Sequence, residues 1–377
     1  MSHCESLVLP TEEAAAAAHR FWITSSLHAL TASSAFSNSP SNSVAARPSP
    51  TKSDAMGLRL SVLHSALLVS LTLSFDVHHK FFNKHWQKSR DVLSLHALSD
   101  AIAREDFPIL ATEAYPGKKL IFLDSAASSQ KPNQVLEAMD QYYKTSHANV
   151  HRGAHALAAK ATAQYEAARE QIREFVNANT YEEIVFTRGA TEAINLVALS
   201  WSQRLIPGDE IILSEMEHHS NLVPWQMVAQ RTGAVLKFVN MNSNMEFDLD
   251  HYYSLLTDRT KMVSIAHASN VLGTCNPVKE VITAAHAVGA VVMLDACQSV
   301  PHMPVDVKEL DVDFLAVSGH KMCGPTGIGF LYGKKDLLNS MPPVMGGGEM
   351  IDRVELLSST YAMSPSRFEA GTPGTLH

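Results

Sequence analysis

The stretch DFLAVSGHKMCGPTGIGFLY, residues 313–332, joins two apolar runs through a glycine-rich turn. The run at 313–318 has the length and composition of a buried strand, and Lys321 follows it in the turn. A single loop lysine is usually a solvated surface charge. Here Ser318 and His320 stand beside it, and a hydroxyl and an imidazole next to a Schiff-base lysine can bind phosphate and assist proton transfer. The stretch therefore predicts a strand that is followed, in a turn, by a reactive lysine.

Outward from this stretch, the chain from about residue 100 alternates short apolar runs with amphipathic helical segments. This alternation is typical of an α/β domain with a mostly parallel sheet and crossover helices. The predicted helices include 133–146, 160–177, 190–202 and 278–288. The predicted strands are 120–124, 183–187, 210–215, 235–240, 262–267, 291–296, 313–318 and 327–332. Ligands of such sheets gather at the carboxyl ends of the strands, so we expect the chemistry there.

Asp295 lies at the end of the apolar strand predicted at 291–296, and Gln298 follows that strand. An acid at such a strand end needs a cationic partner to stay charged, although capping a helix is the simpler alternative for this segment. The pyridinium nitrogen of pyridoxal 5′-phosphate (PLP) would supply that partner, and Gln298 could then hydrogen-bond the ring's phenolic oxygen. Together with Lys321, these residues predict a PLP pocket.

Three further strand ends supply polar groups to the same edge. Ala190 and Thr191 open a helix after a glycine turn, where free backbone N–H groups and the helix dipole can bind the phosphate. His218 follows the strand at 210–215 and can stack over a PLP ring while exchanging protons. Asn270 follows the strand at 262–267 and is a candidate contact to the ring oxygen or the substrate.

Composition and charge narrow the ligand class. Thirty basic against thirty-eight acidic residues give a formal net charge of −8, and no long basic run stands out, so a nucleic-acid partner is not expected. The four cysteines lack a CxxC pairing and are too few for a disulfide framework. The histidines at 64–96, and His147, His151 and His155, do not point to a metal site.

Two N-terminal segments differ from the α/β region. Residues 1–57 are rich in Ala, Ser and Pro and predict a flexible or targeting segment, although Glu5, Glu12 and Glu13 are unusual for a transit peptide. Residues 58–99 are apolar and His-rich, and the run at 60–75 is shorter than the roughly 20 residues that span a bilayer. This run fits a buried helix, a signal core or a targeting segment equally well.

The motifs together resemble the class V aminotransferase family of fold-type I PLP-dependent transferases, and within it the group II cysteine desulfurase/selenocysteine lyase branch. The resemblance covers roughly residues 100–373. It is carried, in chain order, by LDSAASSQKP, ANVHRGAHAL, FTRGATEAINLVA, EMEHHSNLVPWQ, ASNVLGT, LDACQSV, SGHKMCGPTGIGFLYG, GGGEMI and RFEAGTP.

By position, the resemblance implies a role for each candidate residue. Lys321 would carry PLP as a Schiff base, His218 would stack on the ring, and Asn270 would lie beside it. Asp295 and Gln298 would hold the pyridine nitrogen and the phenolic oxygen. The remaining implied contacts are Ala190, Thr191, Ser318 and His320 at the phosphate, Thr372 at the phosphate of a partner subunit, and His151 and Arg152 in a loop at the active-site mouth.

The resemblance also implies a substrate and partners: L-cysteine or L-selenocysteine, a homodimer, a sulfur-acceptor protein and a role in iron–sulfur cluster assembly. A plastid location is expected from the N-terminal tract, with cytoplasm or mitochondrion as alternatives.

The family pattern continues beyond GTP into a small domain with a catalytic cysteine, and we expect this chain, a large domain of residues 100–377, to lack most of that part. Cys4, Cys275, Cys297 and Cys323 do not match the nucleophile's position. The first hypothesis is therefore a cysteine desulfurase that is inactive as written. The alternatives are a PLP-binding pseudoenzyme or dimerising subunit, and another class V activity such as a kynureninase-like or aminotransferase reaction.

Overall fold

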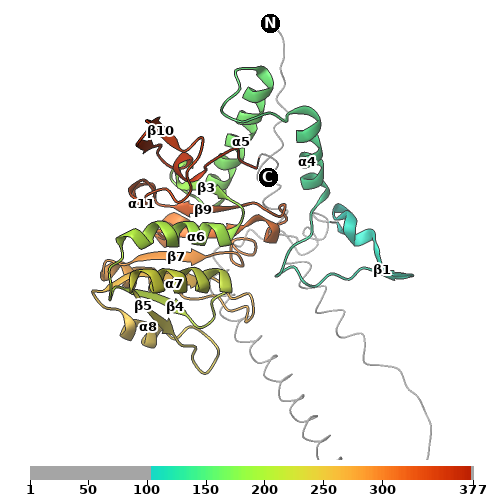
Figure 1. Cartoon of the computed structure of the whole chain (residues 1–377). Helices are drawn as coiled ribbons and strands as arrows, with labels where there is room; N and C mark the ends of the chain where they lie inside the picture. The colour runs from blue at the N-terminus through green and yellow to red at the C-terminus, as the bar shows by residue number, and fades with distance from the viewer. Residues whose placement is uncertain (1–102, 375–377) are drawn as a thin grey trace, which may run out of the picture. The chain divides into compact units, whose positions relative to one another are not determined.

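A seven-stranded sheet organises the part of the chain that the computed structural model describes, residues 103–374 (Figure 1). The strand order is β3-β9-β8-β7-β6-β4-β5. Neighbouring strands from β8 to β5 pair in parallel, whereas β9 is antiparallel to both β3 and β8. The prediction of a mostly parallel sheet is confirmed. The strands are β3 (Ile184–Thr187), β4 (Glu210–Ser214), β5 (Val235–Val239), β6 (Thr260–Ala266), β7 (Val291–Asp295), β8 (Phe314–Ser318) and β9 (Gly329–Gly333).

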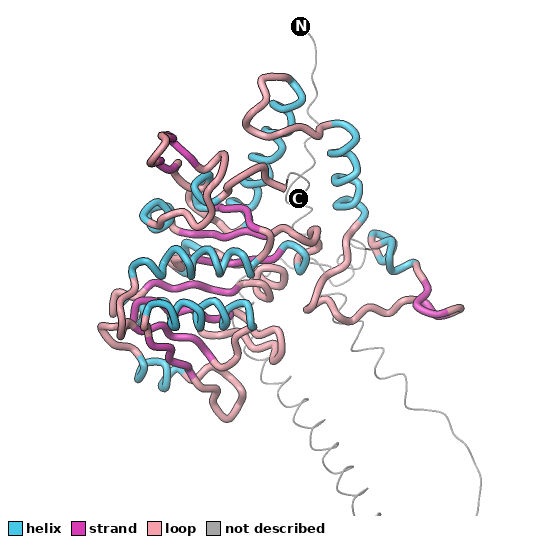
Figure 2. The backbone as a smooth tube through the Cα atoms, in the orientation of Figure 1, coloured by secondary structure: helices cyan, strands magenta, loops and turns pink. Residues whose placement is uncertain are grey.

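Helices cover both faces of this sheet (Figure 2). α6 and α7 pack on one face, and residues of α8, α9 and α10 pack on the other. The predicted helices at 133–146, 160–177, 190–202 and 278–288 are all present, with ends shifted by at most a few residues. The helices are α4 (Asn133–Thr145), α5 (Ala156–Phe175), α6 (Ala190–Trp201), α7 (His219–Thr232), α8 (Leu249–Leu255), α9 (Val278–Ala287), α10 (Val307–Leu310) and α11 (Lys335–Ser340).

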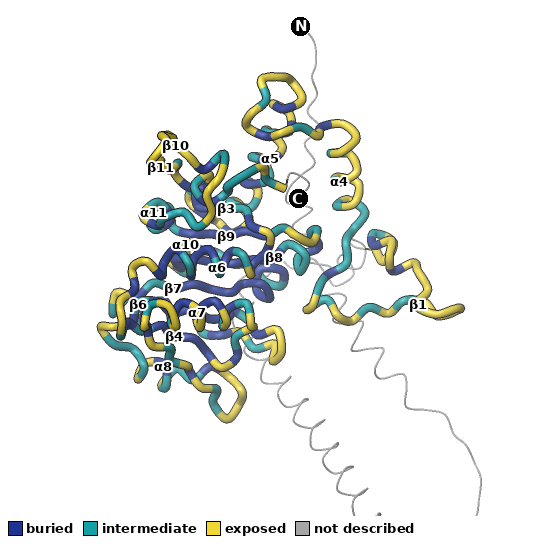
Figure 3. Tube along the Cα trace, in the orientation of Figure 1, coloured by how far each residue is buried: buried dark blue, intermediate teal, exposed yellow. Residues whose placement is uncertain are grey.

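The core follows the two-residue period of the strands. In β4, Ile211 and Leu213 pack with α6 and α7, whereas Ile212 packs with the opposite layer. Each of these three side chains is fully buried, which stabilises the fold by about 1.5–3 kcal/mol per side chain. Figure 3 shows that the central strands of the sheet are buried while the outer loops are exposed, and only the edge strand β5 is largely accessible. Burial on both faces explains why the strands are continuous apolar runs.

One predicted strand is absent. Residues 120–124 form a loop, because no strand among residues 103–374 offers them a hydrogen-bonding partner. Their side chains still alternate: Leu120 and Phe122 pack beside Phe107, while Ile121 and Leu123 are exposed. The apolar alternation therefore correctly indicated an extended segment, but not a paired one.

Two small hairpins lie outside the main sheet. β1 (Glu113–Tyr115) pairs with β2 (Lys118–Lys119), and β10 (Ile351–Val354) pairs with β11 (Ser359–Tyr361). Both hairpins are exposed throughout (Figure 3). Neither was predicted, because their strands are shorter than the apolar runs on which strand prediction depends.

The predicted segments 1–57 and 58–99 lie outside the described residues, so their roles and the expected location stay predictions. Among residues 103–374, no helix combines the length and the apolar character needed to cross a membrane.

A buried ion pair links the end of the described chain to the first half of the domain. Arg169 in α5 makes a bidentate contact with Glu369, through hydrogen bonds of 2.7 and 2.9 Å. Glu369 also accepts a hydrogen bond from the backbone N–H of Phe186 in β3, at 2.7 Å. The side chains of Arg169 and Glu369 are only 1% and 11% exposed. Since the arginine has no other bidentate partner among residues 103–374, loss of the glutamate would leave a poorly compensated buried charge.

We predict that Glu369→Ala lowers the free energy of unfolding by about 3–5 kcal/mol, because it removes the bidentate partner of a buried guanidinium and leaves that charge, within the described chain, only the ion pair with Glu166. Asp140→Ala is the matched control, since it breaks the exposed Lys144–Asp140 pair and should change stability by less than about 0.5 kcal/mol. Urea denaturation followed by circular dichroism measures both. Equal, small losses for the two variants would show that the Arg169–Glu369 pair does not stabilise the fold.

Candidate active site

A cavity of about 440 Å³ opens at the carboxyl ends of the central strands. It collects residues that follow β4, β6, β7 and β8, together with the first turn of α6. Nine of the predicted residues line it, namely Ala190, Thr191, His218, Asn270, Asp295, Gln298, Ser318, His320 and Lys321. The structure thus brings together side chains that are up to 131 positions apart, from Ala190 to Lys321.

Lys321 lies in a tight helical turn, Gly319–Lys321, directly after β8. It is half-buried in the cavity wall, and its ammonium makes no hydrogen bond or ion pair with any of residues 103–374. β9 must begin with a glycine, because a Cβ on Gly329 would come within 2.2 Å of the Val317 carbonyl oxygen of β8. The glycine-rich sequence after the strand therefore lets β9 begin close behind the lysine.

Asp295 ends β7 and is 6% exposed. One of its oxygens accepts a hydrogen bond from the backbone N–H of Cys297, at 3.1 Å, so the carboxylate is held by the turn that follows it. Gln298 donates from Nε2 to the carbonyl oxygen of Ala126, at 2.7 Å. That bond fixes the amide at the cavity wall and ties the β7 turn to the loop before α4.

The first turn of α6 forms the anion-binding end of the cavity. Gly189 adopts φ +146°, which favours glycine, and the next residue's N–H donates to the Ser318 hydroxyl at 2.9 Å. The hydroxyls of Thr191 and Ser220 lie 2.9 Å apart. Burial lowers the pKa of His320, and the positive charge of Lys321 lowers it further. Free N–H groups, hydroxyls and nearby cations together suit a phosphate.

His218 caps α7. Its Nδ1 accepts a hydrogen bond from the backbone N–H of Ser220 at 3.1 Å and lies 3.0 Å from that residue's hydroxyl. The ring is exposed to the cavity, and its second nitrogen makes no hydrogen bond with the described residues. This arrangement leaves one ring face and one nitrogen available to a ligand.

His267 follows β6 but does not line this cavity. It is 6% exposed, and its Nδ1 has no hydrogen-bond partner among residues 103–374. Burial lowers its pKa to about 4. Two histidines at strand ends therefore have opposite surroundings, and only His218 can serve a ligand of the cavity.

Three of the predicted residues lie elsewhere. His151, Arg152 and Thr372 do not line the strand-end cavity. Arg152 pairs with Glu349, and Thr372 is exposed beside a neighbouring hollow. Their predicted roles at the active-site mouth and at a partner's phosphate stay predictions.

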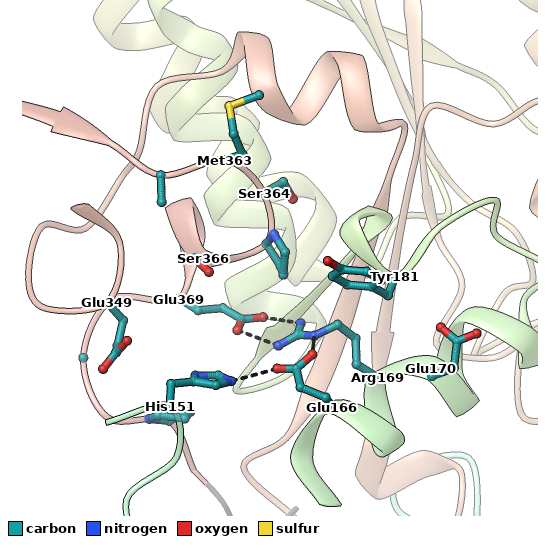
Figure 4. Close-up of a pocket in the computed structure, with 14 residues that line it drawn as sticks. His151, Glu166, Arg169, Glu170, Tyr181, Glu349, Met363, Ser364, Ser366 and Glu369 are labelled. Atoms are coloured by element: carbon teal, nitrogen blue, oxygen red, sulfur yellow. Dashed lines mark hydrogen bonds and ion pairs between the residues drawn. The ribbon is translucent and has the colours of Figure 1, made fainter. Parts of the chain in front are cut away.

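His151 belongs to a second, larger cavity of about 690 Å³ (Figure 4). Its Nε2 lies 2.9 Å from Glu166, which in turn accepts a hydrogen bond from Arg169. Figure 4 shows these side chains and Glu369 forming one chain of contacts along the wall. Because its charged groups are already paired with one another, we assign the chemistry to the strand-end cavity.

The sequence analysis missed part of the wall. Asp124, Ala126 and Ala127, from the loop at 124–128, also line the cavity, as does Ser220. The expectation that chemistry lies at the end of each apolar run would have found the first three, because Asp124 ends the run at 120–124 and Ala126 and Ala127 come directly after it. Among the described residues, no group of three His, Cys, Asp or Glu side chains could hold a metal ion.

Comparison with known proteins agrees with this site. A family model described as aminotransferase class-V matches residues 121–377. The chain belongs to this family. A probable cysteine desulfurase from Synechocystis sp. is 57% identical over 274 residues, which are 72% of this chain and 65% of the relative. The chain therefore spans about two thirds of the length of the curated relatives that it matches.

Two solved structures extend the comparison. A cysteine desulfurase from Escherichia coli has a TM-score of 0.65 and 46% identity, over 72% of this chain and 67% of that one. The cystine C-S lyase C-DES, as a variant with glycine covalently linked to its PLP cofactor, has a TM-score of 0.62 and 25% identity, over 73% and 71% of the two chains. The fold-type I prediction is confirmed.

The cofactor of this class V family member is PLP, and the residues present fit it. A buried carboxylate, Asp295, suits the pyridine nitrogen, while the α6 turn with Thr191 and Ser318 suits the phosphate. Lys321 lies on the same cavity without a competing ion pair among residues 103–374. The cavity thus offers a carboxylate for the ring nitrogen, an anion-binding turn for the phosphate and an amine for the aldehyde, as the cofactor requires.

We predict that purified protein gains a visible absorption band after PLP is added, and that Lys321→Ala abolishes this band because no amine remains to bind the aldehyde. Lys118→Ala, in exposed β2, is the control and should keep the band. Absorption spectra after removal of free PLP measure this. A folded wild-type protein that never gains the band would remove the basis of the assigned roles.

We predict that His267 makes the free energy of unfolding depend on pH. Its folded-state pKa is depressed, so the folded chain binds fewer protons than the unfolded chain between pH 6.5 and about 4. The neutral imidazole contributes its full stabilisation above pH 6.5. As the pH falls from there to about 4, the free energy of unfolding decreases by on the order of 3 kcal/mol in all. His267→Gln should flatten this loss, whereas His147→Gln, at an exposed site, should not.

Urea unfolding at pH 7.5, 6 and 5 measures the difference between each variant and wild type. A His267→Gln variant whose stability falls as steeply as that of wild type would contradict the assignment of a buried, neutral imidazole.

Proposed function

We propose that this protein is a PLP-dependent cysteine desulfurase, which converts L-cysteine to L-alanine and passes the sulfur to a thiol. One observation supports the proposal above the others: Lys321, His218 and Asp295 meet in one cavity at the strand ends, in a chain that is 57% identical to a probable cysteine desulfurase over 274 residues. The selenium analogue of L-cysteine would fit the same cavity.

Each residue has a physical task in this proposal. PLP, when bound, supplies an electron sink for the charge left by the substrate's α-proton. Asp295 keeps its ring nitrogen protonated, because a buried carboxylate is stabilised by a cationic partner. His218, whose Nδ1 is engaged by Ser220, can hold or move a proton at Nε2. Lys321 is an amine that can carry the cofactor and return a proton.

None of the described thiols is suited to accept the sulfur. Cys275 is exposed but does not line the strand-end cavity. Burial raises the pKa of Cys297 and Cys323, and the neighbouring Asp295 carboxylate raises that of Cys297 further. A thiol attacks as the thiolate, so at neutral pH these groups are poor nucleophiles. Among residues 103–374 the cavity therefore supplies cofactor chemistry but not the attacking thiolate.

We also propose that two chains associate and that a sulfur-acceptor protein, in a pathway such as iron–sulfur cluster assembly, takes the product. The exposed position of Thr372, outside its own chain's strand-end cavity, supports the first part. Sedimentation equilibrium of the PLP-loaded protein tests it, and a clean monomer would contradict it.

We predict that L-cysteine changes the visible spectrum of the PLP-loaded 377-residue chain, but that alanine forms at least about 100-fold more slowly than with the relative from Synechocystis sp., because none of the described thiols is suited to attack and the lack of a covalent nucleophile costs orders of magnitude. Chromatography of alanine with dithiothreitol present measures the rate, and Lys321→Ala is the inactive control.

Two outcomes would contradict this. A spectrum that responds to other amino acids but not to L-cysteine would reject the substrate. Fast alanine formation that survives substitution of Cys275, Cys297 and Cys323 would show that the unsuitability of the described thiols does not limit the rate.

A further inference from the structure

A half-buried carboxylate, Glu217, precedes His218 in the sequence. Glu217 accepts hydrogen bonds from the Ser214 hydroxyl, from the backbone N–H of Ala266 at 3.0 Å, and from Asn221 Nδ2 at 2.7 Å. These three donors belong to the end of β4, the end of β6 and the first turn of α7. One side chain therefore joins the three elements that meet at the wall of the cofactor cavity.

The orientation of this network is fixed by the next contacts. Asn221 is fully buried, and its Oδ1 accepts hydrogen bonds from the Ser264 hydroxyl at 2.6 Å and from Trp225 Nε1 at 3.2 Å. The indole N–H can only donate, so Asn221 must present its NH₂ group to Glu217.

Glu217 must therefore accept at both ends of its side chain. Oε2 accepts from Asn221, and Oε1 accepts from the backbone N–H of Ala266. A carboxylate has an acceptor at each end, whereas a primary amide has an acceptor at one end and a donor at the other. A glutamine at this position would therefore leave one donor facing another donor.

The network is next to the cofactor cavity but not in it. His218 and Ala266, the neighbours of Glu217 in sequence and by hydrogen bond, line the cavity, whereas Glu217 does not. Burial raises the pKa of Glu217 to about 7, although the Ser214, Asn221 and Ala266 donors oppose the rise, and Asp295 adds a small increase. The fold thus keeps a partly desolvated acid next to its cofactor site, where an apolar residue would be easier to bury.

We propose that Glu217 is a positioning residue: its three hydrogen bonds hold the His218 turn against the end of β6 and so set where the imidazole stands in the PLP cavity. This role rests on the proposed PLP site, but not on the choice of L-cysteine as substrate. Glu217 touches neither cofactor nor substrate, and acts through the backbone that it fixes.

Exchange of the two polar partners tests the role. Glu217→Gln sets a donor against a donor, and Asn221→Asp places two carboxylates together. The double variant restores one donor and one acceptor at this contact, because the new amide at position 217 can donate to the new carboxylate at position 221. That carboxylate still accepts from Ser264 and Trp225, and the amide oxygen still accepts from Ala266. Glu215→Gln, at an exposed site in the same loop, is the matched control.

The readouts are the PLP dissociation constant, from absorption titration, and the visible circular dichroism of the bound cofactor, which reports the asymmetry of its ring contacts. We expect Glu217→Gln to weaken PLP binding about tenfold and to change the dichroism. The double variant should recover both to within about threefold of wild type, and Glu215→Gln should match wild type. The melting temperature is recorded for every variant.

Three results would overturn the proposal. The first is a folded Glu217→Gln variant with unchanged PLP affinity and dichroism. The second is a double variant that regains the wild-type melting temperature but neither cofactor readout, since Glu217 would then only stabilise α7; this result can be obtained even where the single variant fails to fold. The third is a wild-type protein that never binds PLP, which also rejects the cofactor site, whereas the first two leave that site intact.

Discussion

The parallel pairing of β6, β7 and β8 is the constraint on which the site depends. Their register places Ala266 of β6 beside Asp295 of β7, and Asp295 beside Ala316 of β8. The three strands therefore stop at one edge of the sheet, and the turns after them lie close together. Helices on both faces exclude water from these strands, so the polar groups at their ends lie at the boundary between the core and the cavity.

Much of this arrangement could be predicted, because it depends on local patterns. All seven strands of the sheet were predicted from short apolar runs, and nine site residues from their places after those runs. The α7 helix was harder, since Pro224 and a nearly even mixture of polar and apolar residues interrupt its pattern. The Arg169–Glu369 pair could not be predicted, because 200 positions separate its partners and nothing local marks either one.

The burial and pKa of each strand-end group also could not be predicted from the sequence. His218 and His267 both follow apolar runs, yet one imidazole opens onto the cavity and the other is buried with its pKa lowered to about 4. Glu217 looks like an ordinary loop acid, but burial raises its pKa to about 7 in spite of three hydrogen-bond donors. These differences arise from the groups that pack around a side chain, which depend on the whole tertiary structure.

The cavity holds groups of both signs of charge, and their positions can orient a bound molecule. Asp295 ends β7 and lines the cavity, whereas Glu217, between β4 and α7, lies next to the cavity without lining it. The same cavity wall includes the first turn of α6, with its N–H groups, and Lys321, whose positive charge lowers the pKa of His320. An anion is attracted to the α6 end, and a protonated ring nitrogen to Asp295. Since PLP carries both charges, the protein can fix its direction before any covalent bond to Lys321 exists.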